Sequence, residues 1–170
     1  ITEDYQVIPK PSKMEMLTGK FLVNTNTRIV GSEALNNEGE LLASMLSNAT
    51  GESISFSSEG KGNITLKLDD AIENEEGYEV NVAFDKIEIS AKTAKGIFYG
   101  IQTLRQLMPA NIEAKDGSLK ELTIPAVVIK DDPRFKYRGM HLDVGRHLFP
   151  AEFIKKYIDL IAMHKMNTFH

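Results

Sequence analysis

RFKYRGMHLDVGRHLF, residues 134–149, is the stretch that decides how the end of this chain folds. A strand-like run covers residues 137–144 and breaks at Gly145. Pro150 then favours the first position of a helix, where its missing N–H would be unpaired anyway. Behind it, apolar residues recur at helical spacing, at Phe153, Ile154, Tyr157, Ile158 and Ile161. A strand, a polar turn and an amphipathic helix together predict a βα unit.

Arg146 lies just past the break in this stretch. In barrels built of βα units, residues at the carboxyl ends of the strands carry the chemistry. A guanidinium offers five N–H donors in a rigid fork, which suits two adjacent hydroxyl oxygens. The residues alone leave two interpretations open for Arg146: a substrate contact, or an exposed arginine paired with Asp143.

Three segments of the chain resemble the family 20 glycoside hydrolases, the β-N-acetylhexosaminidases. RGMHLDVGRH, residues 138–147, is similar to the first strand of that family's catalytic barrel. MHKMNTFH, residues 163–170, looks like the second strand, which leads into a His-Trp-His motif. AKGIFYGIQTLRQL, residues 94–107, resembles a helix of the small domain that precedes the barrel. Three motifs in this order are a specific signal.

The resemblance implies an enzyme that removes terminal N-acetylglucosamine or N-acetylgalactosamine from glycans. It implies retention of configuration, with the substrate's own acetamido group as the nucleophile. It also implies no cofactor, and an exported protein that is periplasmic, displayed on the cell surface or secreted. In the family, the catalytic Asp-Glu pair lies beyond the position of His170, so we assign no catalytic residue here. We therefore expect an N-terminal part of such an enzyme, inactive by itself.

The resemblance also implies roles for residues near Arg146, which it makes the substrate-binding residue. Asp143 is expected to hold Arg146 or Arg138 in place, because a carboxylate among apolar strand residues needs a partner. His147 is expected to support the site without touching substrate. His141, Asp143 and His147 could be mistaken for metal ligands. However, the pair at the strand end is His-x-Asp and no close cluster completes three ligands, so we predict no metal.

Composition and charge exclude several classes of function. The chain has 170 residues, 42% hydrophobic and 26% charged, as is ordinary for a globular protein. A formal net charge of −4 argues against a nucleic-acid partner, which would require a basic face. No apolar run of 18 residues exists, so we predict no membrane span. The absence of cysteine excludes disulfides.

Residues 1–131 predict an α+β domain, a mainly antiparallel sheet carrying two helices. The helices are expected over residues 32–51, with Gly51 as the stop, and over residues 93–108. Gly96 and Gly100 lie on one side of the second helix and favour close packing on a sheet. Pro125 suggests that the last strand is an edge strand. Strands are expected at residues 21–24, 27–30, 53–56, 64–68, 78–83, 87–91 and 122–129, after an irregular lead-in over residues 1–20.

A boundary is expected at Asp131-Asp132-Pro133. Residues 132–170 would be the start of a (β/α)₈ barrel and incomplete, since a whole barrel takes at least about 200 residues. With neighbours missing, the barrel strand is expected to have two unpaired edges and its helix an exposed apolar face. Both features favour self-association of this segment.

Two other functions stay open from the residues. One is a metal-dependent barrel hydrolase, and the other is a non-catalytic carbohydrate-binding module formed by residues 1–130. Sugar-binding platforms stack sugar rings on exposed aromatic side chains. The chain has no tryptophan and only 8% aromatic residues, which argues against the binding module.

Overall fold

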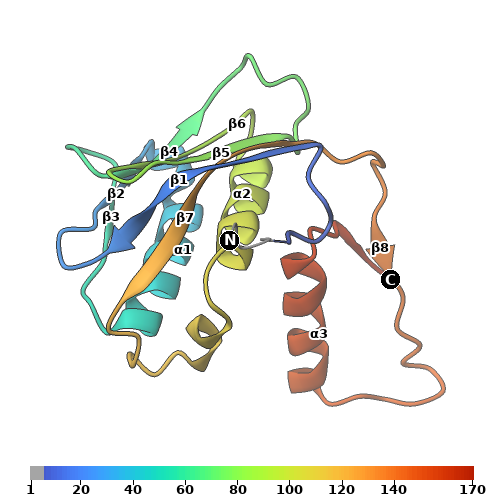
Figure 1. The fold of residues 1–170 in the computed structure, drawn as a ribbon. Helices are drawn as coiled ribbons and strands as arrows, with labels where there is room; N and C mark the ends of the chain where they lie inside the picture. The colour runs from blue at the N-terminus through green and yellow to red at the C-terminus, as the bar shows by residue number, and fades with distance from the viewer. Residues whose placement is uncertain (1–5) are drawn as a thin grey trace. The chain divides into compact units, whose positions relative to one another are not determined.

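The computed structural model describes residues 6–170, and the chain divides into two compact units, Ile1–Asp132 and Pro133–His170 (Figure 1). The first unit contains a seven-stranded sheet, and the second contains a two-stranded sheet. Among the residues described, no helix is both long enough and apolar enough to cross a membrane.

The sheet of the first unit is mixed, with the strand order β1-β7-β5-β6-β4-β2-β3. Antiparallel ladders join β1 to β7, β7 to β5 and β5 to β6, and parallel ladders join β6 to β4, β4 to β2 and β2 to β3. The strands are β1 (Lys13–Val23), β2 (Ile29–Gly31), β3 (Phe56–Ser57), β4 (Ile64–Leu68), β5 (Tyr78–Val82), β6 (Ile87–Ala91) and β7 (Leu122–Asp131). The predicted α+β class and the predicted β5–β6 hairpin are confirmed.

Two helices cover one face of this sheet (Figure 1). Helix α1 (Asn36–Thr50) follows a 3₁₀ turn, η1 (Glu33–Leu35), and ends at Gly51, whose φ of 76° is the left-handed conformation expected of a helix stop. Helix α2 (Ala94–Gln106) precedes a second 3₁₀ turn, η2 (Ala110–Ala114). Each helix carries the chain between parallel strands: α1 links β2 to β3, and α2 links β6 to β7 across β5.

Close packing of α2 on the sheet depends on its two glycines. A Cβ atom at residue 96 would lie 2.3 Å from the carbonyl oxygen of Gly77 and 2.6 Å from the Cβ of Ala91. A Cβ atom at residue 100 would lie 2.5 Å from the Cγ2 of Ile89. The predicted packing role of both glycines is confirmed. Between the two layers lies the core, which includes Leu42, Leu46, Ile64, Leu66, Val80, Ile97, Ile101 and Leu104.

A buried tyrosine connects α2 to β7, the last strand of the first unit, through hydrogen bonds. The Tyr78 hydroxyl donates to Oδ2 of Asp131 at 2.9 Å and lies 2.7 Å from Oγ1 of Thr103. Burial, and then the Asp131 carboxylate, raise the pKa of Tyr78, so its hydroxyl stays protonated and able to donate. The Oδ1 atom of Asp131 accepts from the backbone N–H of Ser12 at 2.9 Å. One side-chain network therefore joins β5, α2, the end of β7 and the segment before β1.

Two predictions from the sequence, one about β1 and one about β7, are wrong. Strand β1 begins at Lys13 rather than near residue 21, so residues 13–20 belong to a strand, with a shift in register between Met16 and Lys20. Residues 1–5 of the expected lead-in lie outside the described part. Strand β7 lies between β1 and β5, so Pro125 is not on an edge strand. Pro125 is tolerated because it lies outside the stretch of β7 paired with β5 and faces Lys20 beside an irregularity in β1.

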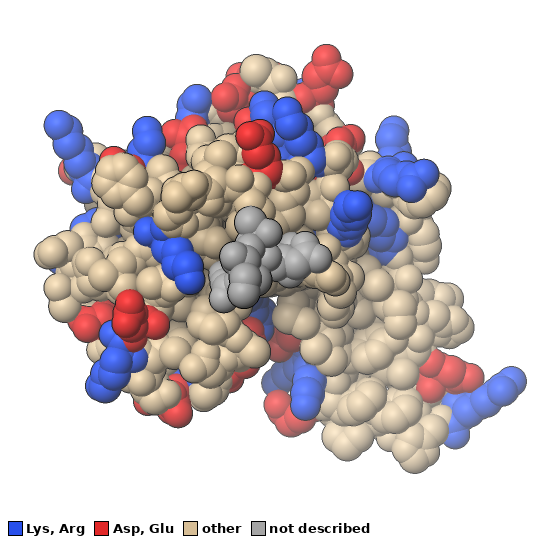
Figure 2. All heavy atoms as spheres, viewed as in Figure 1, with Lys and Arg blue, Asp and Glu red and all other residues tan. Residues whose placement is uncertain are grey.

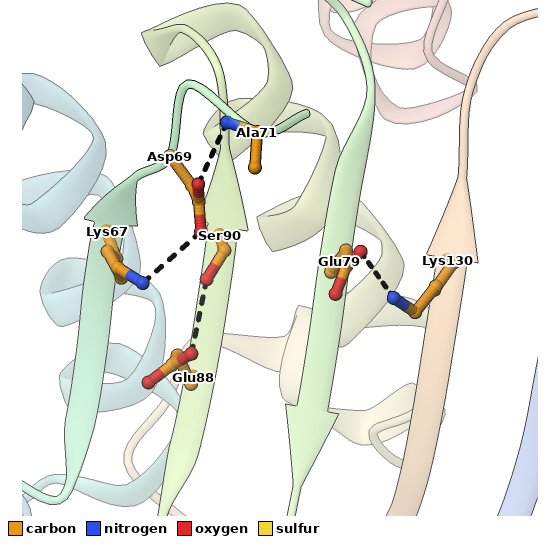
Figure 3. Close-up of polar contacts among 7 residues, drawn as sticks. All are labelled: Lys67, Asp69, Ala71, Glu79, Glu88, Ser90 and Lys130. Atoms are coloured by element: carbon orange, nitrogen blue, oxygen red, sulfur yellow. Dashed lines mark hydrogen bonds and ion pairs between the residues drawn. The ribbon is translucent and has the colours of Figure 1, made fainter. Parts of the chain in front are cut away.

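Polar side chains on the face of the sheet away from the helices form ion pairs and hydrogen bonds (Figure 3). Lys130 Nζ lies 2.7 Å from Oε1 of Glu79, and Lys67 Nζ lies 3.2 Å from Oδ2 of Asp69. The backbone N–H of Ala71, and then Lys67, hold the pKa of Asp69 below its usual value. Exposed pairs of this kind add little stability.

Lysine, arginine and acidic residues are interspersed over the surface in view (Figure 2), without a large patch of one sign.

The second unit is a β-α-β segment: β8 (Gly139–Met140), helix α3 (Ala151–Met163) and β9 (Thr168–Phe169). The predicted βα unit is present, although the strand is far shorter than residues 137–144. The expectation of two unpaired strand edges is wrong, because β8 pairs in parallel with β9. Helix α3 carries the chain back, so the second strand can lie alongside the first.

Replacement of Gly96 by alanine tests the packing of α2. Alanine is favoured over glycine in a helix by about 1 kcal/mol, but its Cβ would meet a backbone oxygen that has little freedom to move. We expect Gly96→Ala to lower the free energy of unfolding by about 1–3 kcal/mol in urea denaturation. Ser44→Ala, on the exposed side of α1, is the control and should be neutral or stabilising. A Gly96→Ala protein as stable as the parent would contradict the packing role.

Candidate functional site

The carboxyl ends of β8 and β9 lie side by side. His170 donates its backbone N–H to the oxygen of Met140 at 2.9 Å, and Leu142 donates to the oxygen of His170 at 2.9 Å. The side chains that follow the two strands are therefore held close together. The rings of His141 and His170 have centroids 5.1 Å apart. This edge is where a parallel α/β arrangement places its chemistry.

Asp143 organises the turn that carries Arg146. Its Oδ1 accepts from the backbone N–H of Gly145 at 3.0 Å and of Arg146 at 3.1 Å, as in an Asx turn. Its Oδ2 lies 3.5 Å from Nε of Arg146. Asp143 was predicted to hold Arg146 or Arg138, and it contacts Arg146. Its side chain is 52% exposed, however, and not buried among strand residues. Its main effect is thus on backbone conformation, because an exposed ion pair adds little.

The Arg146 side chain is 93% exposed, so its guanidinium is available to a ligand. Its backbone is held on one side by Asp143, and on the other side the ring of His147 packs edge-on against Phe149, with centroids 5.0 Å apart. The structure therefore combines a held backbone with an accessible guanidinium fork.

Arg138 lies at the opposite end of β8 and serves a different purpose. Its Nε donates to the oxygen of Lys165 at 2.9 Å, and its Nη1 donates to the oxygen of Phe135 at 2.8 Å. Asn167 completes this anchor: its Oδ1 accepts from the Arg138 N–H at 3.1 Å, and its Nδ2 donates to the Lys136 oxygen at 2.7 Å. Sequence reasoning missed Asn167, since no motif marks an asparagine that bridges segments about thirty positions apart.

Two kinds of side-chain cluster bear on the alternative functions: metal ligands for a metal-dependent hydrolase, and exposed aromatic rings for a carbohydrate-binding module. Within residues 6–170, no group of three or more His, Cys, Asp or Glu side chains could hold a metal ion. In the first unit, the rings of Phe21, Tyr78 and Tyr99 are buried, whereas Phe84, in the turn between β5 and β6, is 75% exposed. One exposed ring in a turn, among residues 6–132, is a poor platform for sugar stacking.

Two family models match consecutive parts of the chain. Residues 4–132 match "Glycosyl hydrolase family 20, domain 2", and residues 135–170 match "Glycosyl hydrolase family 20, catalytic domain". Among curated relatives, a beta-hexosaminidase of Porphyromonas gingivalis is 41% identical, over 96% of this chain and 22% of that protein. A beta-N-acetylhexosaminidase of Cellulomonas fimi is 32% identical, over 98% of this chain and 34% of that protein.

Solved structures give the same result. The N-acetyl-beta-hexosaminidase of Streptomyces plicatus in complex with Thio-NAglucal superposes with a TM-score of 0.90 at 32% identity, over 96% of this chain and 33% of that one. The GH20 beta-N-acetylhexosaminidase of Streptomyces coelicolor A3(2) superposes with a TM-score of 0.91 at 34% identity, over 96% and 34%. The chain thus spans about a third or less of the length of these relatives.

Substitution of Asp143 tests the turn independently of any activity. Loss of a hydrogen bond in Asp143→Ala should cost about 1 kcal/mol and so accelerate amide hydrogen exchange at Gly145 and Arg146 roughly fivefold. Asp143→Asn, which keeps the accepting oxygen, should leave the exchange close to that of the parent. The Ser118 amide, which donates to Asp116 in the first unit, serves as an internal reference. Equal exchange in the alanine and asparagine proteins would contradict the turn.

Proposed function

This chain belongs to glycosyl hydrolase family 20, and from that premise we propose that it is the N-terminal part of an exo-acting β-N-acetylhexosaminidase. The complete enzyme would remove terminal N-acetylglucosamine or N-acetylgalactosamine from glycans, with retention of configuration and with the substrate's acetamido group as nucleophile. The observation that carries the proposal is the succession of two family-20 domains along one chain. The names of the similar proteins, beta-hexosaminidase and beta-N-acetylhexosaminidase, support the same activity.

The two parts of the chain would have different tasks. Residues 1–131 would be the small α+β domain, for which we propose a structural role beside the catalytic barrel. Residues 132–170 would begin the (β/α)₈ barrel and contribute substrate-binding groups, while the Asp-Glu pair belongs to the complete protein. The activity is therefore proposed for the complete protein. We also propose, from family membership alone, that the complete protein is exported.

Arg146 is the residue of this chain proposed to bind substrate. Its place in the connection that follows the carboxyl end of β8, and its accessible guanidinium, support hydrogen bonds to hydroxyls of the sugar at the cleavage point. Asp143 and His147 would act through Arg146: Asp143 by holding its backbone, and His147, the next residue, by its ring contact with Phe149.

Arg146→Ala in the complete enzyme tests this assignment. Hydrogen bonds to charged groups contribute about 1.5–3 kcal/mol each, so loss of two predicts a fall of roughly 10²-fold or more in kcat/KM on an aryl N-acetyl-β-glucosaminide. Arg134→Ala, another exposed arginine of the same segment, is the control and should stay near the parent value. An Arg146→Ala enzyme within threefold of the parent would exclude a binding role.

We further propose that the 170-residue chain, produced by itself, self-associates through α3. Phe153 and Ile158 lie at the two edges of the apolar face of this helix and are each more than 40% exposed, and an exposed apolar face normally marks an interface. Light scattering at high micromolar concentration should give a mass above that of the monomer. A paired change, Phe153→Lys with Ile158→Lys, should restore the monomer, whereas Lys155→Glu should not. A monomeric parent chain would contradict the proposal.

A further inference from the structure

The connection between β8 and α3, residues 141–150, has little apolar contact to hold it. Most of its side chains are exposed, including Val144, Leu148 and Arg146. An arginine that binds a ligand through two donors needs a fixed backbone, because ordering a mobile loop on binding weakens affinity. The Asp143 turn fixes only the residues before and at Arg146.

Phe149 holds the residues after Arg146 and is the first ring of an aromatic row. Phe149, the last residue before Pro150, stacks on Phe153 of α3, with ring centroids 4.6 Å apart and an interplanar angle of 19°. Phe153 stacks in turn on Tyr157, four residues further along the helix, with centroids 6.2 Å apart. Tyr157 then meets Phe169 of β9 at 5.5 Å. The row runs from the connection, along α3, to the neighbouring strand.

The row reaches the proposed site through His147. Its ring meets Phe149 edge-on, at a centroid distance of 5.0 Å and an angle of 75°, a favoured aromatic geometry. His147 is the residue next to Arg146. The Asp143 carboxylate thus holds the backbone at Arg146 itself, and the Phe149 ring contacts the next residue, His147.

We infer that Phe149 is a positioning residue for Arg146: its ring docks the connection onto α3 and holds the guanidinium where it meets substrate. The inference rests on the proposed function of Arg146 and adds a second residue to that site. Phe149 does not touch substrate in this scheme. Its contribution is to keep the backbone of residues 146–148 in one conformation before binding.

Steady-state kinetics of the complete enzyme test the inference. Phe149→Leu removes the stack but keeps an apolar side chain, and should lower kcat/KM about tenfold, mainly through KM, as expected for loss of one aromatic pair. Phe149→Tyr keeps the stack and should restore the parent value. Tyr157→Leu is the matched control: it breaks the same row further along α3 but leaves the Phe149–Phe153 stack, and should stay within threefold. If Phe149→Leu does not fold, Phe149→Met takes its place.

A double-mutant cycle separates positioning from general destabilisation. If Phe149 acts through Arg146, Phe149→Leu should have little further effect in an Arg146→Ala background. Equal losses in both backgrounds, or a Tyr157→Leu loss as large as that of Phe149→Leu, would overturn the inference while leaving the role of Arg146 intact. If Arg146→Ala itself has no effect, the proposed function of that residue fails, and the positioning role fails with it.

Discussion

Helix α2 can lie on strands β5 and β6 only because residues 96 and 100 carry no side chain. Methyl groups there would overlap a backbone oxygen of Gly77 and the side chain of Ile89. The rest of the first unit depends on this contact. It brings Thr103 within hydrogen-bonding distance of Tyr78, and Tyr78 in turn holds Asp131 at the end of the unit. Close packing of a helix on a sheet thus sets where the chain leaves the small domain.

The second unit is held by different forces. Its two strands are only two residues long, and its helix exposes several apolar side chains. Order there comes from a few side-chain contacts: the Arg138 and Asn167 anchor at one end of β8, and the Asp143 turn and the Phe149–Phe153 stack at the other. A substrate-binding arginine benefits from this arrangement, because its backbone is fixed while its side chain stays free to meet a ligand.

The proposed site differs from the open face of the sheet in how its charges are paired. On the open face of the sheet, Lys130 and Glu79, and likewise Lys67 and Asp69, neutralise one another across or along the strands. Arg146 has Asp143 beside it, but the carboxylate lies 3.5 Å from Nε and leaves most of the guanidinium exposed. This difference supports a ligand-binding role at the β8 end and a solvated role for the open sheet face.

The sequence by itself determined the elements whose signals are local. Helical periodicity located α1, α2 and α3, the alternation of residues 78–91 located the hairpin, and Gly51 marked a helix end through its left-handed conformation. The motif around Arg146 identified the family and the candidate site. Sequence did not predict β1 over residues 13–20, the interior place of Pro125 or the pairing of β8 with β9. Nor did it show that Asp143 shapes a turn, or that Phe149 stacks on α3. The first three depend on partners distant in sequence. The Asp143 turn and the Phe149 stack depend on the exact path of the connection, which the spacing of residues does not encode.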